Sequence, residues 1–214
     1  MKLKVTKKLV ICVSLLIILI FITLSGSIMS QVNEPKYKLI SSEGNVEVRE
    51  YSPILVAQVL VIGERKSAIS AGFKILANYI FGNNEGRKNI SMTAPVIQQE
   101  GEKISMTAPV IQQELNDNLH WNVRFVMPFE YTIETLPHPK NNQVKIIPIP
   151  SKRYAVIRFS GLARQSVLQK NLDVLLQYIG SKKLHGTGKP IYAFYNPPWT
   201  LPFLRRNEVM VELE

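Results

Sequence analysis

Cysteine is almost absent from this sequence. The 214 residues contain a single cysteine, Cys12, which lies in an apolar N-terminal run. The rest of the chain therefore cannot form a disulfide, a zinc–thiolate site, a cysteine nucleophile or a covalent cofactor link through C-x-x-C-H. The sequence also lacks G-x-S-x-G, H-E-x-x-H and G-x-G-x-x-G, which excludes the signatures of the α/β-hydrolases, the zincin metalloproteases and the dinucleotide-binding domains.

The sequence has few histidines, and few acidic residues in its C-terminal half. His120, His138 and His185 are the only histidines, and no two have the spacing of metal ligands. Residues 135–207 hold twelve basic residues against one acid, whereas residues 31–134 are nearly balanced. This positive field fits a solvated basic face, an anionic ligand or an anionic membrane. No recognition motif accompanies the charge, so nucleic acid is not an expected partner.

Residues 1–30 are predicted to be a targeting or anchoring segment. Four lysines precede sixteen uncharged residues, Leu9–Leu24, and the small residues 25–27 follow them. This order is typical of a secretory signal, and the segment is also long enough to span a bilayer as an apolar helix. We therefore expect residues 35–214 to form a domain outside the cytoplasm. It would be anchored in the cell membrane, or periplasmic or secreted if the segment is cleaved.

Two repeats predict the architecture of that domain. Residues 90–100 recur identically as residues 104–114, and the short connector between them favours a hairpin. A more diffuse repeat places a strand and then an amphipathic helix at 56–80 and again at 154–179. The first helix has an apolar stripe of Ile69, Phe73, Leu76 and Ile80. Two helices backed by antiparallel strands predict an α+β domain with pseudo-two-fold symmetry, and its seam is a natural ligand site.

Two further segments stand out by their composition. One contains Arg49 and Tyr51 in an R-x-Y pattern, and the other runs from Tyr195 to Val209. The second segment combines aromatic surface and proline stiffness with paired arginines, which can bind a carboxylate through bidentate forks. The alternative is a rigid loop whose arginines bond to backbone carbonyls.

These two segments, together with M-T-A-P-V, which is present twice, resemble the SOUL heme-binding family from about Pro35 to the C-terminus. The resemblance implies a distorted antiparallel β-barrel with two helices and two similar halves, and this architecture is also similar to bacterial effector-binding domains. It further implies non-catalytic, non-covalent binding of heme b or another tetrapyrrole. Such a ligand needs an apolar slot for the ring and cations for its propionates.

The family pattern also suggests individual residues. In one branch a histidine directly before the tyrosine of R-x-Y is the proposed axial ligand, but here that residue is Glu50. Another branch uses an apolar cleft along the first helix, aided by basic side chains. The candidate binding residues are therefore Phe73, Lys74, Ala77, Arg49, Tyr51, Trp199, Arg205 and Arg206, with Met92, Met106 and His120 as weak axial candidates.

Other functions stay open at this point, as does the oligomeric state. An effector-binding module for a different apolar or cationic molecule would be favoured by a pocket lined with glutamates such as Glu50. A hydrolase or metal-removing enzyme of similar architecture would need a paired general acid and base with shifted pKa values in the cleft. The basic C-terminal half could also bind anionic lipid.

Overall fold

A computed structural model describes residues 33–86, 101–115 and 119–214. Residues Asn33–Glu214 form one compact unit. The predicted N-terminal helix, the first copy of the exact repeat and Met92 lie outside the described residues, so the predicted hairpin does too. Within the described ranges, no helix has the length and apolarity that crossing a bilayer requires.

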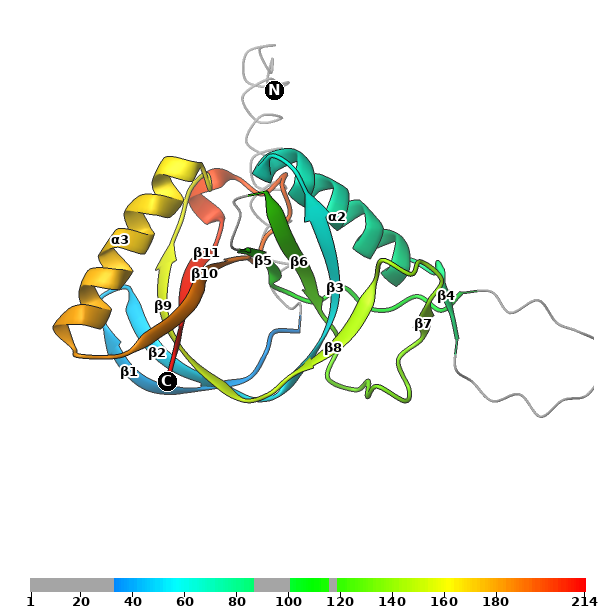
Figure 1. The fold of residues 1–214 in the computed structure, drawn as a ribbon, viewed down its shortest axis with the longest axis horizontal. Coiled ribbons are helices and arrows are strands. Elements are labelled where there is room, and N and C mark those ends of the chain that lie inside the picture. The colour runs from blue at the N-terminus through cyan, green and yellow to red at the C-terminus, as the bar shows by residue number, and fades with distance from the viewer. Residues whose placement is uncertain (1–32, 87–100, 116–118) are drawn as a thin grey trace, which may run out of the picture. The chain divides into compact units, whose positions relative to one another are not determined.

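A nine-stranded antiparallel sheet forms the body of this unit, and it is strongly curled with two helices on its outer face (Figure 1). This arrangement confirms the predicted α+β distorted barrel. In sheet order the strands are β1 (Tyr37–Glu43), β2 (Val46–Tyr51), β9 (Lys152–Phe159), β11 (Asn207–Leu213), β10 (Gly186–Phe194), β5 (Val110–Glu114), β6 (His120–Val126), β3 (Ile54–Ile62) and β8 (Lys145–Ile149). The remaining elements are α2 (Arg65–Ile80), α3 (Gln165–Ser181), the short pair β4 (Asn84–Glu85) and β7 (His138–Pro139), and the 3-10 turn η2 (Pro202–Leu204).

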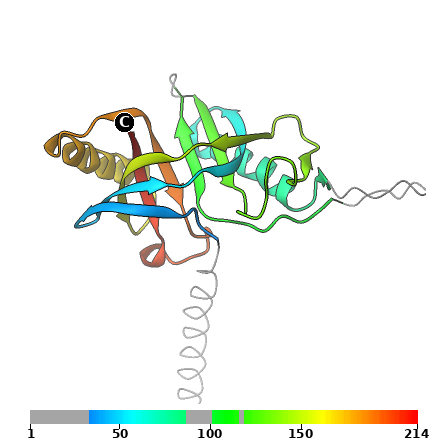
Figure 2. The same cartoon turned by 90° about the horizontal axis from the view of Figure 1, so that it is seen from below.

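The two halves are related about the seam where β10 pairs with β5. On one side lie β11, β9 and β2, covered by α3, and on the other lie β6, β3 and β8, covered by α2. Figure 2 shows the two helices at opposite ends of the unit. Strands β2 and β8 are exchanged between the halves: β2 precedes β3 in the chain but pairs with β9, and β8 precedes β9 but pairs with β3. The exchange makes each half depend on the other.

Equivalent turns lead from strand to helix in both halves. Gly63 ends β3 with φ 125°, and Gly161, 98 residues later, follows β9 with φ 103°. Side chains with a β-carbon rarely adopt such angles, so glycine is the residue that fits both turns. The repeated glycine marks the internal duplication more clearly than the surrounding side chains do.

The main core lies between the outer face of the sheet and the helices. The period of α3 predicts an apolar stripe of Leu168, Leu172, Leu175, Leu176 and Ile179, and α3 buries all of these except Leu176, which is 48% exposed. Helix α2 differs from the prediction, because its closest contact is made by Ala68 and Gly72, while Phe73 remains 37% exposed. Small residues let α2 approach the sheet, which leaves the larger Phe73 ring at the edge of the contact.

A second apolar cluster fills the inner face of the curled sheet. Its buried members all come from strands: Tyr51, Val56, Ile111, Val126, Tyr154, Val156, Ile191, Ala193 and Met210. Because strand side chains alternate, these residues point away from the helices. The inner face is therefore packed with side chains along its length.

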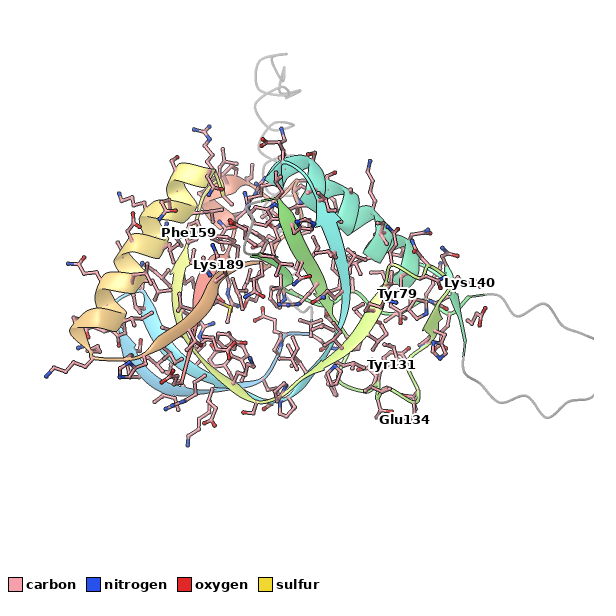
Figure 3. The ribbon with its side chains drawn as sticks, in the orientation of Figure 1. Tyr79, Tyr131, Glu134, Lys140, Phe159 and Lys189 are labelled. Atoms are coloured by element: carbon pink, nitrogen blue, oxygen red, sulfur yellow. The ribbon has the colours of Figure 1, made fainter. Side chains whose placement is uncertain are left out.

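The connection between β6 and β7 folds against the end of α2, where Figure 3 labels Tyr79 and Tyr131. Tyr79 of α2 donates its hydroxyl hydrogen bond to the carbonyl oxygen of Pro137 at 2.7 Å, and Tyr131 donates to the carboxylate of Glu102 at 3.2 Å. In the second copy of the exact repeat only Val110–Glu114 is a strand. The preceding residues instead follow the end of α2, where Ile104 N–H donates to the carbonyl oxygen of Ile80 at 2.9 Å.

Gly72→Ala is expected to lower the free energy of unfolding by about 1–2 kcal/mol, because overpacking outweighs the gain in helix propensity. A β-carbon at Gly72 would lie 2.7 Å from Cγ2 of Val123 and 3.2 Å from Cγ2 of Val59, and valine side chains are stiff. Gly180→Ala in α3 is the matched control. No described heavy atom lies within 4 Å of the added carbon, so a gain of up to about 1 kcal/mol is expected. Urea unfolding of the full-length chain measures both; equal effects would contradict the close approach of α2.

Candidate functional site

A buried ionic cluster joins the two segments that carry the family pattern. Its centre is Glu208 on β11, whose side chain is fully buried. Arg49 donates to both carboxylate oxygens, from Nη1 at 3.0 Å and from Nη2 at 3.2 Å. Arg206 donates from Nε at 2.9 Å, and the Tyr195 hydroxyl donates at 2.7 Å. The carboxylate thus accepts bonds from Arg49 on β2 and from Tyr195 and Arg206, which lie at the two ends of the loop between β10 and β11.

Arg49 has no donor directed towards a ligand. Its Nε donates to Glu47 at 2.6 Å, its Nη1 also donates to the Tyr51 hydroxyl at 2.9 Å, and its guanidinium lies 4.5 Å from the centre of the Tyr37 ring. Burial alone lowers the pKa of Arg49, but the hydrogen bond and charge of Glu208 raise it overall. Burial and the nearby Glu208 raise the pKa of Tyr51 to about 12. The polar groups of Arg49 and Tyr51 therefore bind each other, and Arg49 also binds Glu208.

The C-terminal loop uses its two arginines in different ways. Arg205 donates to the backbone carbonyls of Thr200, at 2.7 Å, and Pro198, which is the alternative that the sequence had left open. Arg206 stacks on Tyr195, with 3.7 Å between its guanidinium and the ring centre, and donates to Glu34 as well as Glu208. Trp199 projects from the loop and is 73% exposed. Neither guanidinium has a free fork for a carboxylate.

The first-helix candidates lie next to one another on α2, at the edge of its contact with the sheet. Phe73 is 37% exposed, and its ring meets Phe125 of β6 edge-on, at 5.2 Å between centroids and 66° between planes. Lys74 is exposed and Ala77 is half-buried one turn further along. The equivalent positions of α3, 99 residues later, hold Leu172, Asp173 and Leu176. At these three positions α2 has an exposed ring and a cation, whereas α3 has a buried leucine and an acid.

The weak axial candidates are distributed over different parts of the unit. Met106 is 44% exposed and lies two residues after Ile104, which contacts the end of α2. His120 opens β6 opposite Ile62, at the far end of β3. Glu50, where one branch of the family has histidine, is half-buried on β2. In the strand register it lies opposite Lys38 of β1 and Arg153 of β9. Among the described residues, no three histidine, cysteine or acidic side chains gather as a metal site.

Sequence reasoning missed one arrangement at the seam. Arg65, the first residue of α2, lies against Trp121, Tyr192 and Phe194, whose ring centres are 5.5–5.9 Å from its guanidinium. The rings come from β6 and β10, far along the chain, so no local motif signals the contact. The apolar alternation of both strands shows that these rings face the helices, but not that they surround an arginine.

Three surface hollows lie away from the candidate binding residues. One of about 510 Å³ lies between β1, the end of α3 and the C-terminus, and another of about 170 Å³ lies between residues 33–36 and 126–131. A third, of about 390 Å³, lies beside β8. None of these three hollows is lined by a predicted binding residue. A ligand on α2 would therefore lie on an open surface.

The curled sheet with two helices defines the class of fold, an α+β domain of two related halves. Solved structures share it: the C-terminal domain of EcmrR has a TM-score of 0.57 at 12% identity, covering 83% of this chain and 98% of that one. A hydrolase from Listeria innocua has a TM-score of 0.51 at 13% identity, covering 82% and 94%. At these identities the likeness extends to the fold alone.

The family is identified by the sequence as a whole. Residues 32–212 match the SOUL heme-binding protein family, and the chain belongs to it. No curated protein matches the chain.

Glu208→Gln is expected to lower the free energy of unfolding by about 3–5 kcal/mol, because it removes the charge of the carboxylate shared by the buried Arg49 and the half-buried Arg206. Glu212→Gln on the same strand is the matched control. Its partner is Lys152, at 2.6 Å, and both side chains are about one-third exposed, so a loss within about 1 kcal/mol is expected. Denaturant unfolding compares the two variants. A loss at Glu208 no larger than at Glu212 would contradict the structural role of the cluster.

Stability is expected to fall between about pH 10 and pH 12. Burial, helped by nearby carboxylates, raises the pKa of both Tyr51 and Tyr154 to about 12, against about 10 in the unfolded chain. The unfolded chain therefore loses these protons first, and stability that is fully present below pH 10 declines as the pH rises. Tyr154→Phe should reduce this decline while shifting stability by a constant amount below pH 9. Parallel declines in both proteins above pH 10 would contradict the shifted pKa of Tyr154.

Proposed function

We propose that this protein binds heme or a related tetrapyrrole, non-covalently and without catalysis, along the exposed edge of α2. The observation that carries the proposal is the exposed Phe73 ring next to Lys74, on the helix where another branch of the family has its cleft. Half-exposed aromatic surface suits the face of a flat ring, and a lysine suits a propionate. Membership of the SOUL heme-binding family supports the ligand class.

The residues present fit such a ligand in part. Phe73 and Ala77 offer a flat apolar surface, Lys74 a cation, and Met106 a thioether near the end of α2. Arg49, Arg205 and Arg206 are engaged within the fold, so they do not support propionate binding. Heme, if it is the tetrapyrrole bound, would supply an iron centre, and Met106 would be the residue available to hold it. We therefore expect modest affinity, as suits buffering, carriage or sensing.

We further propose that residues 1–30 hold the protein at the outer side of a membrane, or direct it there before cleavage. The support is the order of lysines, apolar run and small residues in the sequence. A protein in that place could receive a tetrapyrrole as it crosses or leaves the membrane.

No observation favours a cationic effector instead. Such a ligand needs an uncompensated carboxylate, whereas the buried acid of the inner face, Glu208, already binds Arg49 and Arg206. The inner face is also filled by the second apolar cluster.

Hemin titration of the full-length chain in neutral detergent tests the proposal. We expect a saturable Soret shift at micromolar protein, weakened about tenfold by Phe73→Ala, which removes roughly 1.4 kcal/mol of contact, and a few-fold by Lys74→Ala. The matched controls are Leu176→Ala and Lys170→Ala on the exposed surface of α3, which should bind like the wild type. Circular dichroism confirms that each variant is folded. The absence of a shift, or equal losses on α2 and α3, would remove the proposal.

A further inference from the structure

The guanidinium of Arg65 is enclosed by aromatic rings at the seam between the halves. Its central carbon lies 5.5 Å from the centre of the Tyr192 ring and 5.9 Å from those of Trp121 and Phe194. Trp121 and Tyr192 are buried and Phe194 is half-buried, so the charge lies between an apolar wall and a partly open edge. Ring faces stabilise a cation but leave its N–H groups without acceptors.

Arg65 forms no ion pair with any residue that the structure describes. Its Nη2 donates to the side-chain oxygen of Gln112 on β5 at 2.9 Å, while its buried Nε has no hydrogen-bond partner. Arg49 and Arg206 are paired with carboxylates, whereas Arg124 of β6, which like Arg65 has no described carboxylate partner, donates from Nε and Nη1 to the side-chain oxygens of Gln58 and Gln113. Burial lowers the pKa of Arg65, which reflects the missing counter-charge.

A second unpartnered donor belongs to the same cluster. Trp121 is only 4% exposed, and its buried indole Nε1 has no acceptor among the described residues. A buried donor without an acceptor destabilises the fold, because it has lost its hydrogen bond to water. The Nε–H of Arg65 and the indole N–H of Trp121 both lack an acceptor. Because the arginine charge has no counter-charge among the described residues, a negatively charged acceptor is favoured.

The start of α2 adds to this preference. Glu64, at the N-cap, makes no side-chain capping bond, and the first turn contains no acidic residue. The first N–H groups of α2 therefore have no side-chain cap, although the Glu64 carboxylate stands at the positive end of the helix dipole. An anion near Arg65 would compensate the dipole as well as the guanidinium.

We infer that Arg65 and the Trp121 indole bind the carboxylate of a ligand whose flat apolar body extends from the seam along α2. Arg65, Ile69, Phe73 and Ala77 follow one another at four-residue steps, so they share one stripe of the helix. Arg65 lies two turns, roughly 12 Å, from Phe73. The carboxylate site stands on the Arg65 cluster alone; that its ligand is the tetrapyrrole rests on the proposed function.

Benzoate is the probe for the carboxylate site, and the two tryptophan indole N–H signals are the readout. The full-length chain, labelled with 15N-tryptophan in neutral detergent, contains only Trp121 and the exposed Trp199. Benzoate should move the Trp121 signal saturably and leave that of Trp199 in place. Neutral benzamide, of the same shape, should move neither. An unmoved Trp121 signal in millimolar benzoate, or equal shifts with benzamide, would overturn the inference without any variant.

Arg65→Gln should weaken benzoate binding at least tenfold. The matched control is Arg164→Gln, because Arg164 is exposed at the equivalent start of α3, 99 residues later, and should bind like the wild type. If Arg65→Gln does not fold, Arg65→Lys replaces it; this variant keeps the charge but loses the planar fork, and should still weaken binding measurably. Undiminished binding by a folded Arg65 variant would overturn the inference.

Hemin and its dimethyl ester separate this inference from the proposed function. We expect Arg65→Gln to weaken hemin binding about tenfold while leaving ester binding unchanged, because the ester has no carboxylate. Hemin binding that depends on Phe73 but not on Arg65 would leave the proposed function standing and remove Arg65 as the partner of its carboxylate. A benzoate response without any hemin binding would uphold the carboxylate site and remove the tetrapyrrole.

Discussion

The Glu208 carboxylate is the point on which the arrangement of the strands depends. It lies on a central strand, fully buried, and is compensated by Arg49 from the exchanged strand β2 and by Arg206 from the C-terminal loop. A buried carboxylate without these partners would cost several kcal/mol. The cluster therefore holds the loop, β2 and β11 together, and it gives the R-x-Y and R-R-N-E-V segments a role in the fold. Residues that look suited to a ligand are engaged by the protein itself.

The two halves of the internal duplication share the features that the fold requires and differ in features that are present in one half alone. Both halves keep the glycine that turns the chain from strand into helix and the same order of pairing. They differ on the surfaces of the helices: Phe73 and Lys74 are exposed on α2, whereas α3 has a buried leucine and Asp173 at these positions. They differ also at the seam, where Arg65 is enclosed by rings and Arg164 is exposed. The differences gather along α2, which is the reason to place ligand binding there.

The elements could be predicted from the sequence because their patterns are local. The helical period of α3 and the apolar alternation of β6 predict a helix and a strand. The spacing of nearly 100 residues between similar segments predicts the two-fold symmetry. The exchange of β2 and β8 could not be foreseen, since alternation shows which face a strand buries and not which neighbour it pairs with. Likewise, Arg49 precedes Glu208 by 159 residues, and the rings around Arg65 come from two separate strands. Phe73 fitted an apolar stripe, but contact through Gly72 turned its ring outward.

The filled inner face constrains how this fold can serve a ligand. Nine buried apolar side chains and the Glu208 cluster occupy the region that a hollow barrel would offer. A flat ligand therefore has the exposed edge of α2 and the seam beside it, where water reaches one side of the ring. Binding in such a place is reversible, and its specificity must come from the ends of the ligand more than from enclosure of its body. An arginine with unsatisfied donors at one end of the helix stripe would supply that specificity, since a buried N–H group that lacks an acceptor discriminates strongly in favour of a ligand that provides one.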